Sequence, residues 1–150
     1  GHFKLTNDFA SIGLGFGTAL GVAAGRPECT TVLVIGAGGF LMTMGELETA
    51  VREDLPLVIV LMNDCAYGAE LHFLTQWQLP AAKAVFPDVD YAPVAEAFGF
   101  RAATIRSLED LHEVAPMLKQ PQGPIFLDCK INAAIAAPFM GEFAHFEGHH

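Results

Sequence analysis

Two runs of aliphatic residues, each followed directly by small or polar residues, constrain the fold of this chain most strongly. The first run covers residues 32–35, after Thr31, and leads into the glycine-rich stretch 36–39. The second covers residues 57–62 and ends in Asn63 and Asp64. A continuous aliphatic run is typical of a strand buried on both faces, as in a parallel sheet. Because the carboxyl ends of parallel strands meet at one edge, we expect the glycines and the polar pair to lie close together.

The rest of the chain alternates helical and strand-like segments. Glycine and proline mark most of the boundaries between them, and Ser107 is expected to cap the last helix. Four strands that alternate with helices predict an α/β fold with a parallel sheet flanked by helices. We predict strands at 31–35, 57–62, 100–105 and 125–131, helices at 17–25, 42–53, 69–78, 91–98 and 107–119, and a loop over 81–90.

Composition and charge limit the classes of partner. Hydrophobic residues make up 52% of the chain and charged residues 17%, which suits a sheet covered by helices. The net charge is −9 with only eight Lys and Arg, so nucleic acid is not an expected partner. No apolar run is long enough for a membrane span, so a membrane partner is not expected either. The three cysteines have no metal-like spacing, so we expect reduced thiols in a cytoplasmic protein.

The segments 36–39 and 63–68 predict a site for an anion with its cation. Backbone N–H groups at the start of a helix bind phosphate, and amide and carboxylate oxygens suit Mg²⁺. A purely structural interpretation stays open, because glycines also form tight strand-to-helix turns and Asn63 and Asp64 also cap helices.

Taken together, these segments resemble the diphosphate-binding domain of thiamine diphosphate enzymes. That family carries Gly-Asp-Gly and, near the end of the next strand, Asn-Asn; the corresponding residues here are Gly36-Ala37-Gly38 and Asn63-Asp64. The flanking stretches 12–16 and 45–52 are also similar, and 62–73 is most similar to the benzaldehyde lyase and acetolactate synthase branch. The resemblance covers nearly all of residues 10–132.

The resemblance implies roles for individual residues. Asp64 and the backbone carbonyl of Ala66 match ligands of Mg²⁺, whereas Ala37 matches an acidic ligand and its methyl group cannot perform that role. Gly38, Gly39 and Phe40 would point N–H groups at the diphosphate, and Ile12 would support the bent cofactor. The complete set of implied cofactor-binding residues is Ile12, Gly36, Gly38, Gly39, Phe40, Asn63, Tyr67 and Gly68.

The implied cofactors are thiamine diphosphate and Mg²⁺, and the implied enzyme is a carboligase or decarboxylase of 2-oxo acids or aldehydes. In this family a glutamate on a pyrimidine-binding domain, of the same or a partner subunit, activates the cofactor. We therefore expect no catalytic residue in this chain, no turnover by the chain alone, and assembly as a homodimer or homotetramer. The alternatives are a degenerate, non-catalytic module of the same fold and a different α/β nucleotide-binding protein.

The two ends of the chain carry weaker signals. The start has a loop-like segment and no opening strand, so we expect one domain over residues 1–146 that lacks its first strand. Residues 147–150, Glu-Gly-His-His, have the appearance of a tag remnant.

Overall fold

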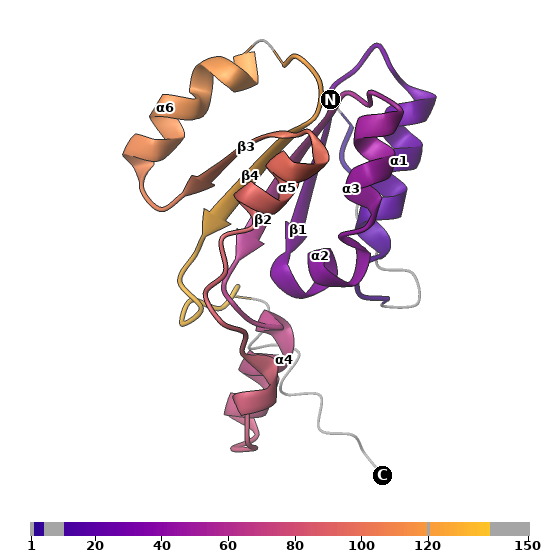
Figure 1. The fold of residues 1–150 in the computed structure, drawn as a ribbon. Helices are drawn as coiled ribbons and strands as arrows, with labels where there is room; N and C mark the ends of the chain where they lie inside the picture. Colours follow the sequence, from indigo (N-terminus) through magenta and orange to yellow (C-terminus); the bar gives the residue numbers. More distant parts are fainter. Residues whose placement is uncertain (1, 5–10, 120, 139–150) are drawn as a thin grey trace.

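The computed structural model describes residues 2–4, 11–119 and 121–138. Within these residues, a single sheet has the strand order β1-β2-β4-β3, and every pair of neighbours is parallel (Figure 1). This architecture confirms the predicted α/β class. The strands are β1 (Thr31–Gly36), β2 (Leu57–Asn63), β3 (Arg101–Ile105) and β4 (Ile125–Lys130). The predicted tag remnant at 147–150 lies outside the described residues.

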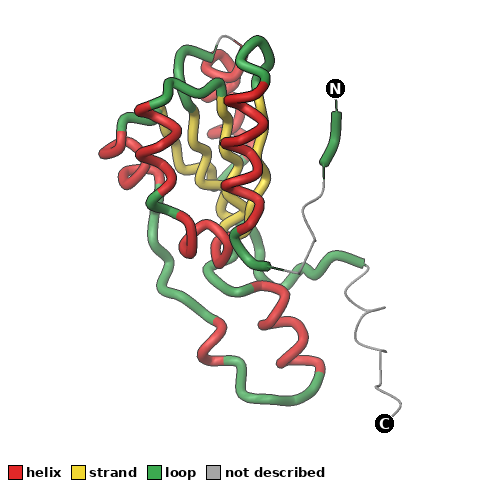
Figure 2. The backbone as a smooth tube through the Cα atoms, turned by 90° about the vertical axis from the view of Figure 1, so that its right-hand side faces the viewer, coloured by secondary structure: helices red, strands yellow, loops and turns green. Residues whose placement is uncertain are grey.

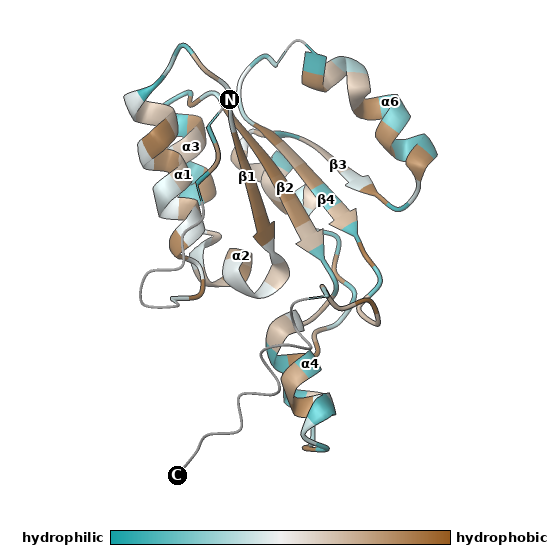
Figure 3. Cartoon of the chain, turned by 180° about the vertical axis from the view of Figure 1, so that it is seen from behind, coloured by the Kyte–Doolittle hydropathy of each residue, from teal (hydrophilic) through white to brown (hydrophobic). Residues whose placement is uncertain are grey.

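Helices cover both faces of the sheet, but unequally. Four of them pack on one face, where their small and aliphatic residues meet β1, β2 and β4, and α6 packs on the other face over β3 and β4 (Figures 1 and 3). The α4 segment extends beyond the carboxyl ends of the strands (Figures 1 and 2). The helices are α1 (Leu14–Gly25), α2 (Ala37–Thr43), α3 (Glu46–Arg52), α4 (Gly68–Gln76), the 3₁₀ turn η2 (Ala82–Ala84), α5 (Ala92–Phe98) and α6 (Leu108–Lys119).

An aromatic cluster forms the centre of the larger core. Phe126, near the start of β4, has its ring centroid 5.2 Å from that of Phe40 and 6.3 Å from that of Phe100. Tyr91 meets Phe40 edge to face at 5.5 Å. Because Phe40 belongs to α2, this cluster connects the sheet to the helix that follows β1, and so fixes the start of that helix relative to the strands.

The opposite face is covered over only part of its width. Val58, Ile125 and Leu127 pack beneath α6. On the edge strand β1, however, Val32 is 59% exposed and Val34 is 65% exposed, and among the described residues no helix covers this strand on that face (Figure 3). Both valines occupy alternate positions on one side of β1, so the prediction of a strand buried on both faces is wrong for this run, whereas it is confirmed for β2.

The boundaries of several helices differ from the prediction. We predicted one helix over 42–53, but the structure has two, α2 and α3, and α2 begins at Ala37, immediately after β1. The glycine-rich stretch is therefore the first turn of a helix and not a loop, because packing of Phe40 in the core outweighs the poor helix propensity of glycine. Helix α1 likewise begins at Leu14, three residues before the predicted start.

The predicted cap of α6 is present. The Ser107 side-chain oxygen accepts the Asp110 N–H at 3.1 Å, and the Asp110 carboxylate accepts the Ser107 N–H at 2.9 Å and the Arg106 N–H at 2.7 Å. This reciprocal arrangement is a capping box. In the part of the chain that the structure describes, every helix is too short or too polar to cross a membrane.

Candidate functional site

A groove of about 480 Å³ lies at the carboxyl ends of β1 and β2, between the first turns of α2 and α4. Adjacent parallel strands end here in register, with Gly36 beside Met62. Most of the predicted site residues come together in this groove. Its lining includes Ile12, Gly36, Ala37, Gly38, Gly39, Asp64, Ala66, Tyr67 and Gly68, together with Val34, Met62, Glu70 and Ile131, which we did not predict.

Gly38 has no room for a side chain, because the Tyr67 ring covers it. A Cβ built on Gly38 would lie 2.3 Å from Cδ1 of Tyr67, well inside van der Waals contact. The ring is held by Phe86, edge to face at a centroid distance of 4.8 Å, and the Tyr67 N–H donates to the Ala84 carbonyl at 2.8 Å. The tyrosine therefore fixes the distance between the α2 and α4 sides of the groove.

Asp64 and Gly68 form the other wall. The Asp64 Oδ1 accepts the Ala66 N–H at 3.1 Å, and its Oδ2 would lie 2.2 Å from a Cβ built on Gly68. Only glycine at position 68 lets α4 begin this close to the carboxylate. The remaining lone pairs of Asp64 face a groove that is also lined by Ala66 and Glu70, so a cation held here would meet acidic oxygens.

The donor set fits a diphosphate better than it fits a metal ion. Gly38 and Gly39 are in the first turn of α2, where backbone N–H groups have no partner within the helix. For Mg²⁺, the chain offers the Asp64 carboxylate and the Ala66 carbonyl, whereas Ala37 is 1% exposed and has no donor atom. Among the described residues, no three His, Cys, Asp or Glu side chains come close enough together to hold a metal ion. Phosphate oxygens and water would have to complete the coordination.

Two of the predicted cofactor-binding residues lie beneath the groove. Phe40 is fully buried in the aromatic core, and at the fourth position of α2 its N–H is the first to find a partner within a regular helix. Asn63 is also buried, and its amide group faces protein partners. Neither residue lines the groove, so direct contact of these two with the cofactor stays a prediction.

Asn63 shapes the loop that carries Asp64. Its Nδ2 donates to Asp128 Oδ1 at 2.8 Å and to the Val89 carbonyl at 3.3 Å, and its Oδ1 accepts the Cys65 N–H at 3.1 Å. The pKa of the Cys65 thiol is raised, first by burial and then by the Asp88 carboxylate. This cysteine is therefore poorly suited to act as a nucleophile.

We did not predict Asp128 and Lys130, which support this loop. Asp128 is fully buried on β4 and accepts the Tyr91 N–H at 2.7 Å as well as the Asn63 amide. A carboxylate inside the otherwise apolar run 125–129 was the available signal, because a buried charge needs partners. Lys130 follows two residues later, paired in register with Asn63.

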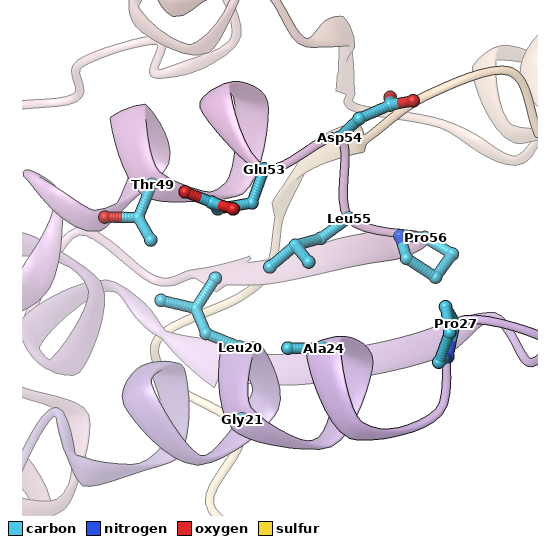
Figure 4. Close-up of a pocket in the computed structure, with 9 residues that line it drawn as sticks. All are labelled: Leu20, Gly21, Ala24, Pro27, Thr49, Glu53, Asp54, Leu55 and Pro56. Carbon is cyan, nitrogen blue, oxygen red and sulfur yellow. The ribbon is translucent and has the colours of Figure 1, made fainter.

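A second groove, of about 460 Å³, lies at the opposite end of the sheet, between α1 and α3 (Figure 4). The side chains of Leu20 and Ala24, from α1, point toward Leu55 on the opposite side, and Pro27 and Pro56 face each other at one end (Figure 4). Parallel α/β sheets bind ligands at the carboxyl ends of their strands, and this groove lies next to the amino end of β1, where Thr31 N–H donates to the Pro56 carbonyl. We therefore assign the functional site to the first groove.

Comparison with known proteins agrees with the geometry. Residues 1–129 match the family described as thiamine pyrophosphate enzyme, C-terminal TPP binding domain; thiamine pyrophosphate is another name for thiamine diphosphate. Acetolactate synthase of Bacillus subtilis is 28% identical over 85% of this chain, and pyruvate oxidase of Lactiplantibacillus plantarum is 30% identical over 87%. The matches span 22% and 23% of the lengths of these two relatives.

The fold also has a counterpart among solved structures. A thiamine diphosphate-dependent 4-hydroxybenzoylformate decarboxylase of Rhodococcus jostii superposes with a TM-score of 0.73 over 81% of this chain and 23% of that one, at 24% identity. The family match decides against the alternative of an unrelated α/β nucleotide-binding protein. The chain belongs to the thiamine pyrophosphate enzymes and corresponds to their C-terminal, cofactor-binding domain.

Proposed function

We propose that the groove between α2 and α4 binds the diphosphate of thiamine diphosphate, within an enzyme that ligates or decarboxylates 2-oxo acids or aldehydes. The main support is that two distant segments of the chain meet in one groove. Residues 36–39 and 64–68 are distant in the sequence, yet they line one groove at the carboxyl ends of neighbouring strands. Relatives named acetolactate synthase and pyruvate oxidase support the substrate class.

In this proposal the backbone does most of the binding. The N–H groups of Gly38 and Gly39 face the diphosphate, and Gly36, where β1 passes into α2, lies beside it. Such local donors are needed because the chain as a whole carries a net charge of −9, which repels an anion. Ile12, which is 45% exposed at the groove, supports the thiamine part of the cofactor.

Mg²⁺ is the proposed counter-ion, held by Asp64 and by the backbone carbonyl of Ala66. Two protein donors are few, but Mg²⁺ commonly binds through one or two carboxylates plus phosphate oxygens and water. Gly68 keeps α4 close to the Asp64 carboxylate, and Tyr67 closes the groove beside Gly38. These residues orient the cofactor; none of them is proposed to transfer a proton.

When bound, thiamine diphosphate supplies the electron sink for cleavage and formation of carbon–carbon bonds. The activating glutamate and the pyrimidine site are proposed to lie on another domain, in the same or a partner subunit of a cytoplasmic homodimer or homotetramer. The chain alone should then bind the cofactor without turning over a 2-oxo acid.

Isothermal titration calorimetry tests the proposal. Thiamine diphosphate should bind in the presence of Mg²⁺, more weakly when EDTA replaces the metal, and more weakly still when thiamine monophosphate is used. The variant Glu53→Gln, in the groove at the other end of the sheet, is the matched control and should bind like the unaltered chain. Absence of binding under all conditions would contradict the proposal.

A second candidate is a degenerate module that kept the fold and lost its metal. The buried Ala37 favours it, because the methyl side chain at this position cannot coordinate a metal ion. The variant Ala37→Asp tests whether this alanine weakens the metal site. If position 37 faces the metal, restoring the carboxylate should tighten Mg²⁺-dependent binding about tenfold, as one charge-assisted contact allows. Equal affinities of the two chains would show that position 37 does not contact the ion.

A further inference from the structure

The loop 63–67 is held from inside the protein by a buried carboxylate. Asp128, on β4, accepts hydrogen bonds from the Asn63 side chain at 2.8 Å and from the Tyr91 backbone at 2.7 Å. Asn63 in turn accepts the Cys65 N–H. Because Asp128 is fully buried, losing either hydrogen bond would leave a polar atom without a partner away from water, so Asp128 fixes where β2 ends and the loop begins.

The same loop is held from outside by the segment 84–90. Tyr67 N–H donates to the Ala84 carbonyl at 2.8 Å, and Phe86 N–H donates to the Cys65 carbonyl at 2.6 Å. These two bonds form a short antiparallel bridge between Ala66 and Val85. The position of the 84–90 segment therefore sets the position of the loop.

Lys130 joins these two supports. Its side chain is only 10% exposed, and its ammonium group donates to Asp88 at 2.8 Å and to the Val89 carbonyl at 2.6 Å. It lies 3.1 Å from Asp90 and 3.6 Å from the buried Asp128. Burial lowers the pKa of Lys130, but the bonds to Asp88 and Asp90 outweigh it and the pKa is raised, so the group is a cation at neutral pH.

The loop needs such support because its backbone is strained. Cys65 has a φ of +57°, in the left-handed region. For a residue with a Cβ this conformation costs about 1–2 kcal/mol. Both peptide groups of Cys65 are held by the two supports, because its N–H donates to Asn63 Oδ1 and its carbonyl accepts the Phe86 N–H.

We propose that Asp128 and Lys130 are positioning residues, which hold the loop 63–67 in the shape that presents Asp64 and the Ala66 carbonyl to the cofactor. Neither residue lines the groove. They act through Asn63 and the 84–90 segment. The part of the inference that concerns the cofactor rests on the proposed function, whereas the part that concerns the loop does not.

The test uses Asp128→Asn and Lys130→Met in the whole chain. In both variants, hydrogen exchange at the amides of Cys65 and Ala66 should become about tenfold faster, while the amides of β1 keep their protection. The Kd for thiamine diphosphate with Mg²⁺ should rise about tenfold. If Asp128→Asn does not fold, Lys130→Met decides the question, because methionine keeps the length and apolar stem of lysine.

Arg106→Met is the matched control. Arg106 contacts the same two aspartates, Asp90 at 2.6 Å and Asp88 at 3.5 Å, but its side chain is half-exposed and does not approach Asp128. Exposed pairs contribute little, so exchange at Cys65 and Ala66 should stay unchanged.

Three results would overturn the proposal: unchanged exchange in Lys130→Met, acceleration that is equal in β1 and in the loop, or the same loosening in Arg106→Met. If the unaltered chain does not bind thiamine diphosphate, the proposed function fails, and the exchange data still decide the role of the two residues in the loop.

Discussion

The contact between Gly38 and Tyr67 allows a sharp test of the groove. In Gly38→Ala the new methyl group would lie 2.3 Å from the Tyr67 ring, and the ring must move about 1.2 Å to restore ordinary contact of about 3.5 Å. This movement weakens the edge-to-face pair with Phe86, which is worth about 0.5–1.5 kcal/mol. Alanine in the first turn of α2 gains about 0.5–1 kcal/mol over glycine. The two effects nearly cancel.

We therefore expect the free energy of unfolding to stay within about 1 kcal/mol of the unaltered chain, while affinity for thiamine diphosphate falls. Urea unfolding measures the first quantity, calorimetry the second, and NMR shifts of the Tyr67 and Phe86 rings report the movement. Gly21→Ala, on α1, is the control for helix propensity, because its Cβ would meet nothing within 4 Å. A loss of more than about 3 kcal/mol, or unshifted rings, would refute the reasoning.

Three further outcomes follow from the structure. Phe126→Ala should cost about 3–5 kcal/mol of unfolding free energy, measured with urea, because the ring is fully buried against Phe40. Backbone N–H groups, that of Arg106 foremost, lower the pKa of Asp110 below the ordinary 3.8. The ionised Asp110 therefore contributes its full stabilisation of the folded state above pH 3.8 and loses it as the pH falls through the lowered, folded-state pKa. The difference in Tm between the unaltered chain and Asp110→Asn should stay constant at neutral pH and become smaller in that acidic range. Burial raises the pKa of the Cys65 and Cys129 thiols, so a thiol reagent at mildly alkaline pH should label the exposed Cys29 first.

The order of elements was predictable because it depends on local patterns. The aliphatic runs in β1 and β2 and the glycine and proline boundaries indicated strands and helices without knowledge of their neighbours. The start of α2 at Ala37 was not predictable in the same way, because two glycines oppose a helix locally. Phe40 holds that turn helical through contacts with Phe126 and Tyr91, which lie far along the chain.

The candidate site also has a part that was predictable from the sequence and a part that was not. The residues that line the groove belong to two short motifs, which could be recognised from the sequence. Asp128 and Lys130 belong to no such motif. Their contact with the Asn63 loop depends on the pairing of β4 with β2, which local sequence patterns do not predict. Asn63 shows a related limit: its motif position suggested contact with the cofactor, whereas the structure places its amide group against Asp128.

The hydrogen bond between Asn63 and Asp128 joins residues separated by 65 positions, and this separation matters while the protein is being made. At about 5–20 residues per second, a ribosome needs on the order of 3–13 s to add that length of chain after Asn63. During this interval β2 can pair with β1, but the loop after it has no inner support. The nascent chain should thus acquire its affinity for the cofactor late, after β4 has been synthesised, so the cofactor can stabilise only chains whose sheet is already complete.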